Sequence, residues 1–133
     1  MFEIFERRRE HFDTEPGISI SEYGKMAFNK PASDFIKTKN WKSVVLLFDK
    51  ESKKIGIRIP KRFNEAEYKL NYHGDNYFVF NSPSFIKFIK YPLSRTRRYS
   101  LEWNEKEQMY IVDLSEIYDI MGAKTDRKPA YQQ

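Results

Sequence analysis

The chain has no cysteine among its 133 residues, and only five glycines and two histidines. Without cysteine it can form neither a disulfide framework nor a thiolate metal site, which fits the reducing cytoplasm where we expect the protein to reside. Its few glycines form no phosphate-binding loop and no nucleophile elbow. No stretch approaches the roughly 18 consecutive apolar residues that a membrane helix requires. Thiol chemistry, P-loop phosphate binding and helical membrane insertion are therefore excluded.

Catalytic and metal-binding side chains are also scarce. His11 and His73 stand apart, with no second histidine near either one at metal-ligand spacing. The acidic residues at 49–51 and 105–107 fall in predicted hairpin turns, where water usually solvates them. A pair of carboxylates brought together by the fold is the acid–base arrangement that the sequence leaves open. We predict a non-enzymatic protein without a metal or other cofactor.

What the chain does contain is a large apolar fraction arranged in short periods. Apolar residues make up 40% and aromatic residues 17% of the sequence, which is enough to build a core. Alternation at 17–21 and 25–28 predicts half-buried strands, and the apolar run 44–48 predicts a central strand. Asn29 followed by Pro31 predicts the start of a short helix. We expect a mostly β protein with short helices, in the α+β class.

Two stretches of the chain look alike: "YGKMAFNKPASDFI" and "HGDNYFVFNSPSFIKFI". A spacing of 52 residues aligns the Phe-Asn-x-Pro words at 28–31 and 80–83. A spacing of 53 aligns the Phe-Ile-Lys words at 35–37 and 88–90, and one of 55 aligns the later strands 55–59 and 110–114. The repetition predicts one structural unit used twice.

The predicted organisation is two ββαββ units, 18–62 and 63–122, between an N-terminal extension (1–17) and a tail (123–133). The second unit is expected to end in a short C-terminal helix, which Ser115 caps and Gly122 stops. We expect the two units to form a barrel-like or swapped-hairpin core, and the protein to be a homodimer.

Charge is distributed unevenly along the chain. The formal net charge is +5 and the isoelectric point about 9.3. Residues 23–100 contain 17 Lys/Arg and 6 Asp/Glu, whereas residues 101–121 contain one Lys and six acids. A basic middle beside an acidic end favours a surface that attracts a polyanion such as nucleic acid. The alternative is that these charges only keep a small domain soluble.

The densest basic segment is "KYPLSRTRRY", which we predict to be a loop. It contains Lys90, Arg95, Arg97 and Arg98 between two tyrosines. Arginine suits phosphate because its planar guanidinium can donate two parallel hydrogen bonds, and a neighbouring aromatic ring adds a surface for stacking. A weaker counterpart is "KTKNWK", whose Trp41 we expect in the core. The triplet "RRR" at 7–9 is another candidate, although glutamates flank it.

The first unit, "ISISEYGKMAFNKPASDFI…WKSVVLLFDKESKKIGIRI", resembles the AbrB/MraZ class of swapped-hairpin transcription regulators. The matching features are Gly24-Lys25, the strand 26–28, Pro31 with the Phe-Ile pair at 35–36, and the hairpin 44–59. The tandem arrangement is similar to MraZ. The chain departs from the class at Asp34, where an arginine is usual near the helix, and at Asp75, which replaces the basic residue after Gly74.

The resemblance implies a DNA-binding regulator in which Lys25 and Lys30 contact phosphates and position the protein. Two alternatives remain. The stretch 44–89 also looks like the ββββα unit of the PC4/Whirly single-strand-binding proteins, in which aromatic residues would stack on unpaired bases; the candidates are Tyr68, Tyr72, Tyr77 and Phe78. The other alternative is a structural module that binds protein and no nucleic acid.

Overall fold

The computed structural model describes residues 14–74, 77–92 and 95–120. Within them the chain is mostly β, with two short helices. The strands are β1 (Gly17–Ile20), β2 (Lys25–Phe28), β3 (Ser43–Asp49), β4 (Lys54–Arg58), β5 (Tyr68–Lys69), β6 (Asn71–His73), β7 (Tyr77–Asn81), β8 (Arg97–Ser100), β9 (Glu102–Asn104), β10 (Met109–Asp113) and β11 (Ile117–Ile120). The helices are α2 (Lys30–Lys39) and α3 (Pro83–Phe88).

These strands form two antiparallel sheets and do not close into a barrel, so the barrel-like core expected from the sequence is not what the chain builds. One sheet has the order β11-β8-β1-β2-β7-β6 and the other β5-β3-β4-β10-β9. Two segments pass from one sheet to the other. Leu70 joins β5 to β6, and Leu101 joins β8 to β9; both leucines are buried. The backbone N–H groups of Leu70 and Leu101 donate to Lys42 O and Pro16 O, both at 3.0 Å.

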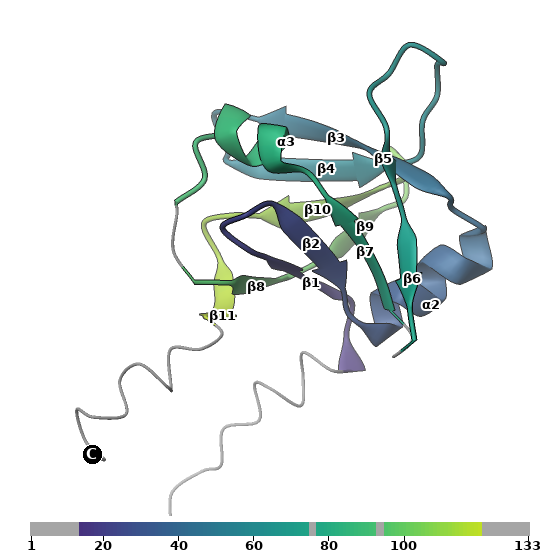
Figure 1. Ribbon diagram of the computed structural model, residues 1–133, viewed down its shortest axis with the longest axis horizontal. Coiled ribbons are helices and arrows are strands. Elements are labelled where there is room, and N and C mark those ends of the chain that lie inside the picture. The colour runs from purple at the N-terminus through teal and green to yellow at the C-terminus, as the bar shows by residue number, and fades with distance from the viewer. Residues whose placement is uncertain (1–13, 75–76, 93–94, 121–133) are drawn as a thin grey trace, which may run out of the picture.

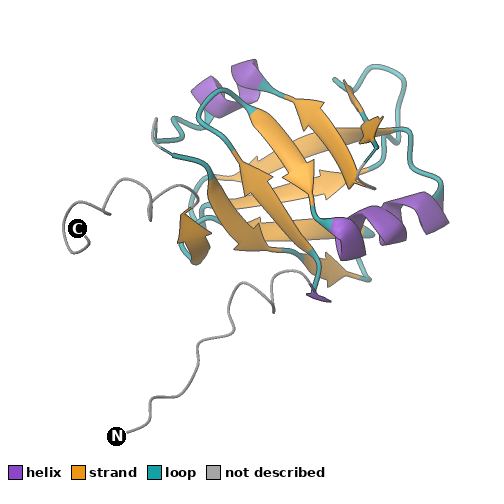
Figure 2. Cartoon of the chain, turned by 60° about the horizontal axis from the view of Figure 1, so that its bottom comes forward, coloured by secondary structure: helices purple, strands orange, loops and turns teal. Residues whose placement is uncertain are grey.

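The core lies between the two sheets, and the alternation in the sequence decides which side chains enter it. Ile18 and Ile20 of β1 and Met26 and Phe28 of β2 are all buried, as the period of two requires. One cluster joins them to residues of the other sheet such as Ile57. The helices lie at opposite ends of the sheets (Figures 1 and 2). The molecule therefore has an α2 end and an α3 end.

Both sheets contain a central pair of strands from opposite halves of the chain. In the first, β2 pairs with β7 so that Ala27 lies opposite Val79, residues 52 apart in sequence. In the second, β4 pairs with β10 so that Gly56 lies opposite Ile111, residues 55 apart. Over the four central strands, each sheet has the same order of hairpin strands on either side of its central pair. Neither half of the chain forms a sheet by itself.

The two helices end in the same way. Asn40 after α2 and Lys90 after α3 both adopt left-handed backbone, with φ of 61° and 57°. The next residues, Trp41 and Tyr91, donate backbone hydrogen bonds to Ile36 O and Ile86 O at 3.1 and 3.0 Å. These contacts match at a spacing of 50 residues. The alignment of the helical Phe-Ile-Lys words at a spacing of 53 was therefore wrong: 35–37 corresponds to 85–87.

Two other expectations were also wrong. Residues 117–120 are strand β11 and not a helix, because their β-branched and aromatic side chains extend the first sheet by pairing with β8. The predicted ββββα unit is divided, since β3 and β4 belong to one sheet and β6 and β7 to the other. The N-terminal triplet at 7–9, Asp75, Gly122 and the tail 123–133 lie outside the described residues.

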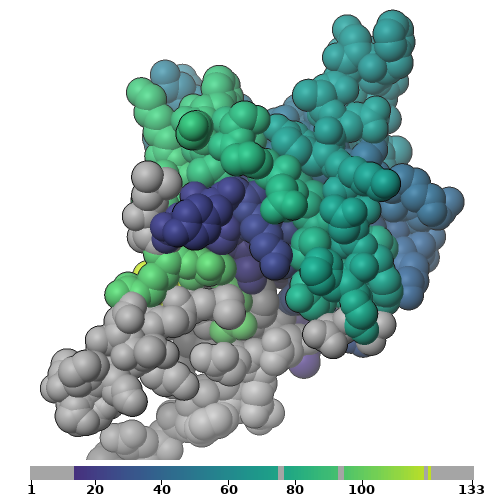
Figure 3. Space-filling model, in the orientation of Figure 1, coloured from purple at the N-terminus to yellow at the C-terminus, as the bar shows by residue number. Residues whose placement is uncertain are grey.

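The connector between β4 and β5, residues 59–67, projects from the rest of the molecule at the upper right of Figure 3. It is an ordered loop, because Arg58 Nη2 donates to Glu65 Oε2 at 2.7 Å and both side chains are largely buried. Glu65 also accepts the backbone N–H of Lys61 at 2.7 Å. At its tip Phe63 is 98% exposed.

Candidate anion-binding site

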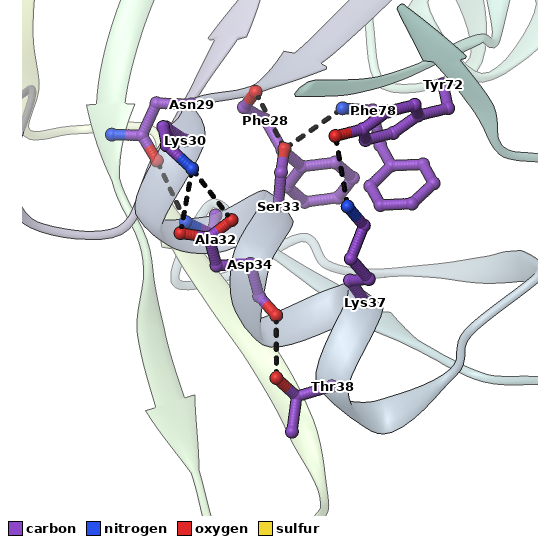
Figure 4. A network of polar contacts seen from close by, with 10 residues as sticks. All are labelled: Phe28, Asn29, Lys30, Ala32, Ser33, Asp34, Lys37, Thr38, Tyr72 and Phe78. Carbon is purple, nitrogen blue, oxygen red and sulfur yellow. Dashed lines mark hydrogen bonds and ion pairs between the residues drawn. The ribbon is translucent and has the colours of Figure 1, made fainter. Parts of the chain in front are cut away.

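The basic residues predicted to bind nucleic acid do not form one cluster. Lys25 begins β2 and lies opposite Asn81, close to the start of α3. Lys30 lies at the other end of β2, as the first residue of α2. Its Nζ atom is 3.1 Å from Asp34 Oδ1, so a carboxylate on the same helix already compensates its charge (Figure 4). Lys30 is therefore a weak candidate for phosphate contact.

The α2 end is held together by internal polar contacts (Figure 4). Asn29 Oδ1 accepts the backbone N–H of Ala32 at 3.1 Å, which confirms the predicted helix cap. The buried Ser33 hydroxyl accepts the backbone N–H of Phe78 at 2.9 Å. Lys37 Nζ donates to the hydroxyl of Tyr72 at 3.2 Å. This network ties α2 to β6 and β7.

The predicted basic loop is partly a strand, which changes the role of two arginines. Arg97 and Arg98 begin β8, in the interior of the first sheet between β1 and β11. Arg98 is only 6% exposed and lies opposite Ser19 in the register. A side chain so deeply buried cannot contact a macromolecule at the surface, so its assignment as a nucleic-acid contact was wrong. Arg95 is exposed, and Arg97 is half-buried.

The α3 end is hollowed on two sides of Tyr91. On one side is a groove of about 390 Å³, which we call the α3 groove. It is lined by Glu22, Tyr23, Pro83, Ile86, Lys87, Lys90 and Tyr91. On the other side is a pocket of about 250 Å³, which we call the Tyr91 pocket. It is lined by Phe48, Lys53, Ile89, Lys90, Tyr91, Pro92, Arg97, Tyr99, Leu114 and Ser115.

The turn between β1 and β2 forms a wall of the α3 groove by docking on the start of α3. Gly24 O accepts the backbone N–H of Ser82 at 2.8 Å and its hydroxyl at 3.2 Å. Gly24 has a φ of +92°, and a Cβ atom there would lie 2.7 Å from Pro83 Cα. Only glycine allows this close approach, because other residues lack both the backbone freedom and the space.

The floor of the Tyr91 pocket is aromatic and its walls are cationic. The hydroxyls of Tyr91 and Tyr99 are 2.8 Å apart and form a buried hydrogen bond. Burial, and then this hydrogen bond, raise the pKa of Tyr91 well above its usual range, so the phenol stays neutral. Three cations, Lys53, Lys90 and Arg97, line the pocket, and none of its described lining residues is acidic.

Arg97 is the most enclosed of the three cations. Its guanidinium carbon lies 5.9 Å from the centre of the Tyr91 ring. Its Nε atom is buried and has no hydrogen-bond partner among the described residues. A buried donor without an acceptor is uncommon in folded proteins and costs stability unless a ligand or water satisfies it.

The corresponding position at the α2 end is filled. At a spacing of 50, Trp41 matches Tyr91; at 55, Trp103 matches Phe48 and Tyr110 matches Ile55. Trp41, Trp103 and Tyr110 pack with ring centres 5.3 to 6.3 Å apart. The larger rings occupy the space that is open at the α3 end. Trp41 is buried, as expected from the sequence.

No protein-family model matches the chain, and neither a curated protein nor a solved structure matches it significantly. Among the described residues, no group of three or more histidine, cysteine or acidic side chains is arranged to hold a metal. None of the described helices is long and apolar enough to cross a membrane.

A third hollow, of about 380 Å³, is acidic in character. Glu102, Asp113 and Glu116 line it together with Lys54. It lies beside β10 and β11, away from α3 in the chain order, and so the acidic end predicted from the sequence adjoins a different hollow from the cations.

Of the six predicted contacts, the fold brings Lys90 and Arg97 into one pocket, and it adds two lysines that the sequence reading missed. Lys87 lines the α3 groove and Lys53 the Tyr91 pocket. Lys53 lies in the turn between β3 and β4, far from the basic segment in sequence. The signal that could have found it is the repeat: Lys53 matches Gln108 at a spacing of 55, so one half has a cation where the other is neutral.

Proposed function

We propose that the protein binds duplex DNA as a non-enzymatic transcription regulator, through the cations at its α3 end. One observation supports this most: Lys53, Lys87, Lys90 and Arg97 line two adjoining hollows, where Glu22 is the sole acid among the described lining residues. Lysine and arginine concentrated in this way favour a phosphate backbone. Such contacts give affinity and position without reading base sequence.

We further propose that the chain is a duplicated ββαββ unit, related to the swapped-hairpin regulators that its first half resembles. Three kinds of correspondence support this. The central strand pairs centre on residues 52 and 55 apart. The helix ends match at a spacing of 50. Lys53 and Gln108, 55 apart, both have left-handed backbone, with φ of 58° and 54°.

Under this proposal the two halves divide the work. The α2 end, with its aromatic cluster and internal polar network, stabilises the fold. The α3 end keeps its space and its positive charge for a ligand. Homodimer formation is a separate proposal, and light scattering in solution tests it directly, because one chain has a mass of 16.1 kDa.

The test is a mobility-shift series on duplex and single-stranded DNA in rising salt. Each phosphate contact contributes about 0.9 to the slope of log affinity against log salt. The double variant Lys87→Gln, Lys90→Gln should therefore reduce that slope by about 1.8 and weaken binding to all sequences similarly. The control Lys69→Gln, Lys106→Gln removes the same charge from exposed positions elsewhere and should leave the slope unchanged.

Three results would count against the proposal. The first is no shift on any duplex at low salt. The second is equal loss of binding in the test and control variants, because then net charge and not the α3 end would matter. The third is a strong preference for single strands, which would instead favour the aromatic stacking alternative through residues such as Tyr72.

A further inference from the structure

The Tyr91 pocket exists because the two ends of the molecule are built from side chains of different size. Phe48 and Tyr91 stand where the α2 end has Trp103 and Trp41. At the α2 end the rings also contact Phe35, at 4.8 Å from Trp103 and 6.5 Å from Trp41. Folding normally fills interior space to high density. A pocket of about 250 Å³ left open in only one of two matching positions is a feature to explain.

The same comparison shows where the positive charge was placed. Lys90 adopts left-handed backbone where the α2 end has Asn40, and Lys53 does so where Gln108 stands. Asparagine is among the non-glycine residues that favour this conformation, whereas lysine has no such preference. Two lysines therefore occupy backbone positions that do not favour them, and both line the Tyr91 pocket. Local stability does not account for that choice.

Arg97 supplies the third charge in a form suited to a planar or tetrahedral anion. Its Nε–H has no acceptor among the described residues, so the guanidinium retains hydrogen-bonding capacity. The described acidic side chains of the neighbouring turn are engaged elsewhere: Asp49 Oδ1 accepts the backbone N–H groups of Glu51 and Ser52 at 3.1 and 3.4 Å. Asp113 accepts the hydroxyl of Ser115.

From these observations we propose that the Tyr91 pocket binds a phosphomonoester. The phosphate would lie among Lys53, Lys90 and Arg97, because three positive charges with arginine among them match a dianion with several acceptor oxygens. The pocket is also larger than a phosphate group needs, since water occupies about 30 Å³ per molecule. Phe48 and Tyr91 give the remaining space an apolar lining for the organic part of the ester.

Two sources could supply such a group: a free phosphate ester, or a phosphate of nucleic acid. The pocket and its charges are the same in both cases. The proposal does not depend on DNA binding, because the pocket is formed by residues of this chain alone.

The first experiment is a calorimetric titration of the full chain with phenyl phosphate and with inorganic phosphate, at constant ionic strength. The wild type should bind both saturably and the ester more tightly, because only the ester uses the apolar lining. The double variant Lys53→Gln, Lys90→Asn should bind at least tenfold more weakly. Each replacement is the residue that the other half of the chain has at the matching left-handed position, so the fold should be retained.

The matched control is Lys50→Gln, Lys106→Gln, which removes the same charge from exposed turn positions outside the pocket. A third variant, Arg97→Lys, keeps the charge but removes the planar guanidinium, and should weaken binding while the circular dichroism spectrum stays that of wild type. No saturable binding by the wild type, or an equal loss in the control and pocket variants, would overturn the proposal.

The second experiment separates the two sources. Phenyl phosphate is added to a preformed DNA complex while total ionic strength is fixed. Displacement of DNA that the pocket variant abolishes supports the proposal and makes a DNA phosphate the competing occupant. An unchanged complex, with saturable titration, supports it with a free ester as the ligand. If the protein binds no DNA at all, the calorimetric titration alone still decides whether the pocket binds phosphate.

Discussion

Replacing Gly24 with alanine should destabilise the fold far more than replacing Gly74, although the two glycines look equivalent in sequence. Gly24 is buried, has a φ of +92°, and lies against backbone: an added Cβ would be 2.7 Å from Pro83 Cα and N and 2.9 Å from Ser82 C. Gly74 has nothing within 4 Å of the same atom and no left-handed φ.

The expected magnitude follows from two terms. A left-handed backbone costs a residue with a Cβ about 1–2 kcal/mol. Overpacking against backbone, which cannot rotate away as a side chain can, adds about 1–3 kcal/mol. The free energy of unfolding of Gly24→Ala should therefore fall by about 2–5 kcal/mol. For a chain of this length that corresponds to a melting temperature lower by about 8–20 °C.

Urea denaturation of wild type, Gly24→Ala and Gly74→Ala, followed by circular dichroism, measures these differences. Gly74→Ala should be within about 1 kcal/mol of wild type and on the stabilising side, because alanine restricts the unfolded chain. If Gly24→Ala were as stable as wild type, or if both variants lost stability equally, the contact between the β1–β2 turn and α3 would not have the energetic role that we assign to it.

Two further predictions concern a helix cap and an ion pair. Asn29→Ala should reduce the free energy of unfolding by about 1–2 kcal/mol, because it removes the α2 cap, whereas Asn81→Ala, exposed at the end of β7, should change it by less than about 0.5 kcal/mol; thermal unfolding tests both, and equal effects would contradict the assignment. Hydrogen bonds from Arg58, then from the Lys61 backbone, lower the pKa of Glu65 from 4.5 to about 2, so its ionised form stabilises the fold above pH 4.5 and this contribution is lost as pH falls towards 2. The difference in unfolding free energy between wild type and Glu65→Gln should shrink over that interval; a difference independent of pH would refute the ion-pair account.

Strands with alternating apolar residues were predictable, because their burial depends on period alone. Ile18 and Ile20 face the core for this reason, and the helix start at Asn29 and Pro31 follows from local backbone chemistry. The corresponding Asn81 behaves differently: it ends β7, and Ser82 occupies the cap position of α3 without a side-chain cap bond. The same word in the sequence thus has two local structures.

The site was only half predictable. "KYPLSRTRRY" was correctly identified as the basic segment, but sequence could not say that Arg97 and Arg98 pair with β1, which lies about 80 residues earlier in the chain. That pairing buries Arg98 and directs Arg97 to the Tyr91 pocket. Lys53 reaches the same pocket from a different hairpin, and such long-range proximity has no local signal.

The sequence by itself determined the mostly β character, the repeated strand–strand–helix pattern and the concentration of charge, since each depends on neighbouring residues along the chain. Tertiary structure alone decided that the halves pair strand by strand in both sheets, that one matching space is filled by tryptophans while the other stays open, and that three cations gather at the open one. The physical reason is that pocket volume and net local charge are sums over side chains distant in sequence. Folding brings those side chains together, and composition does not record which of them meet.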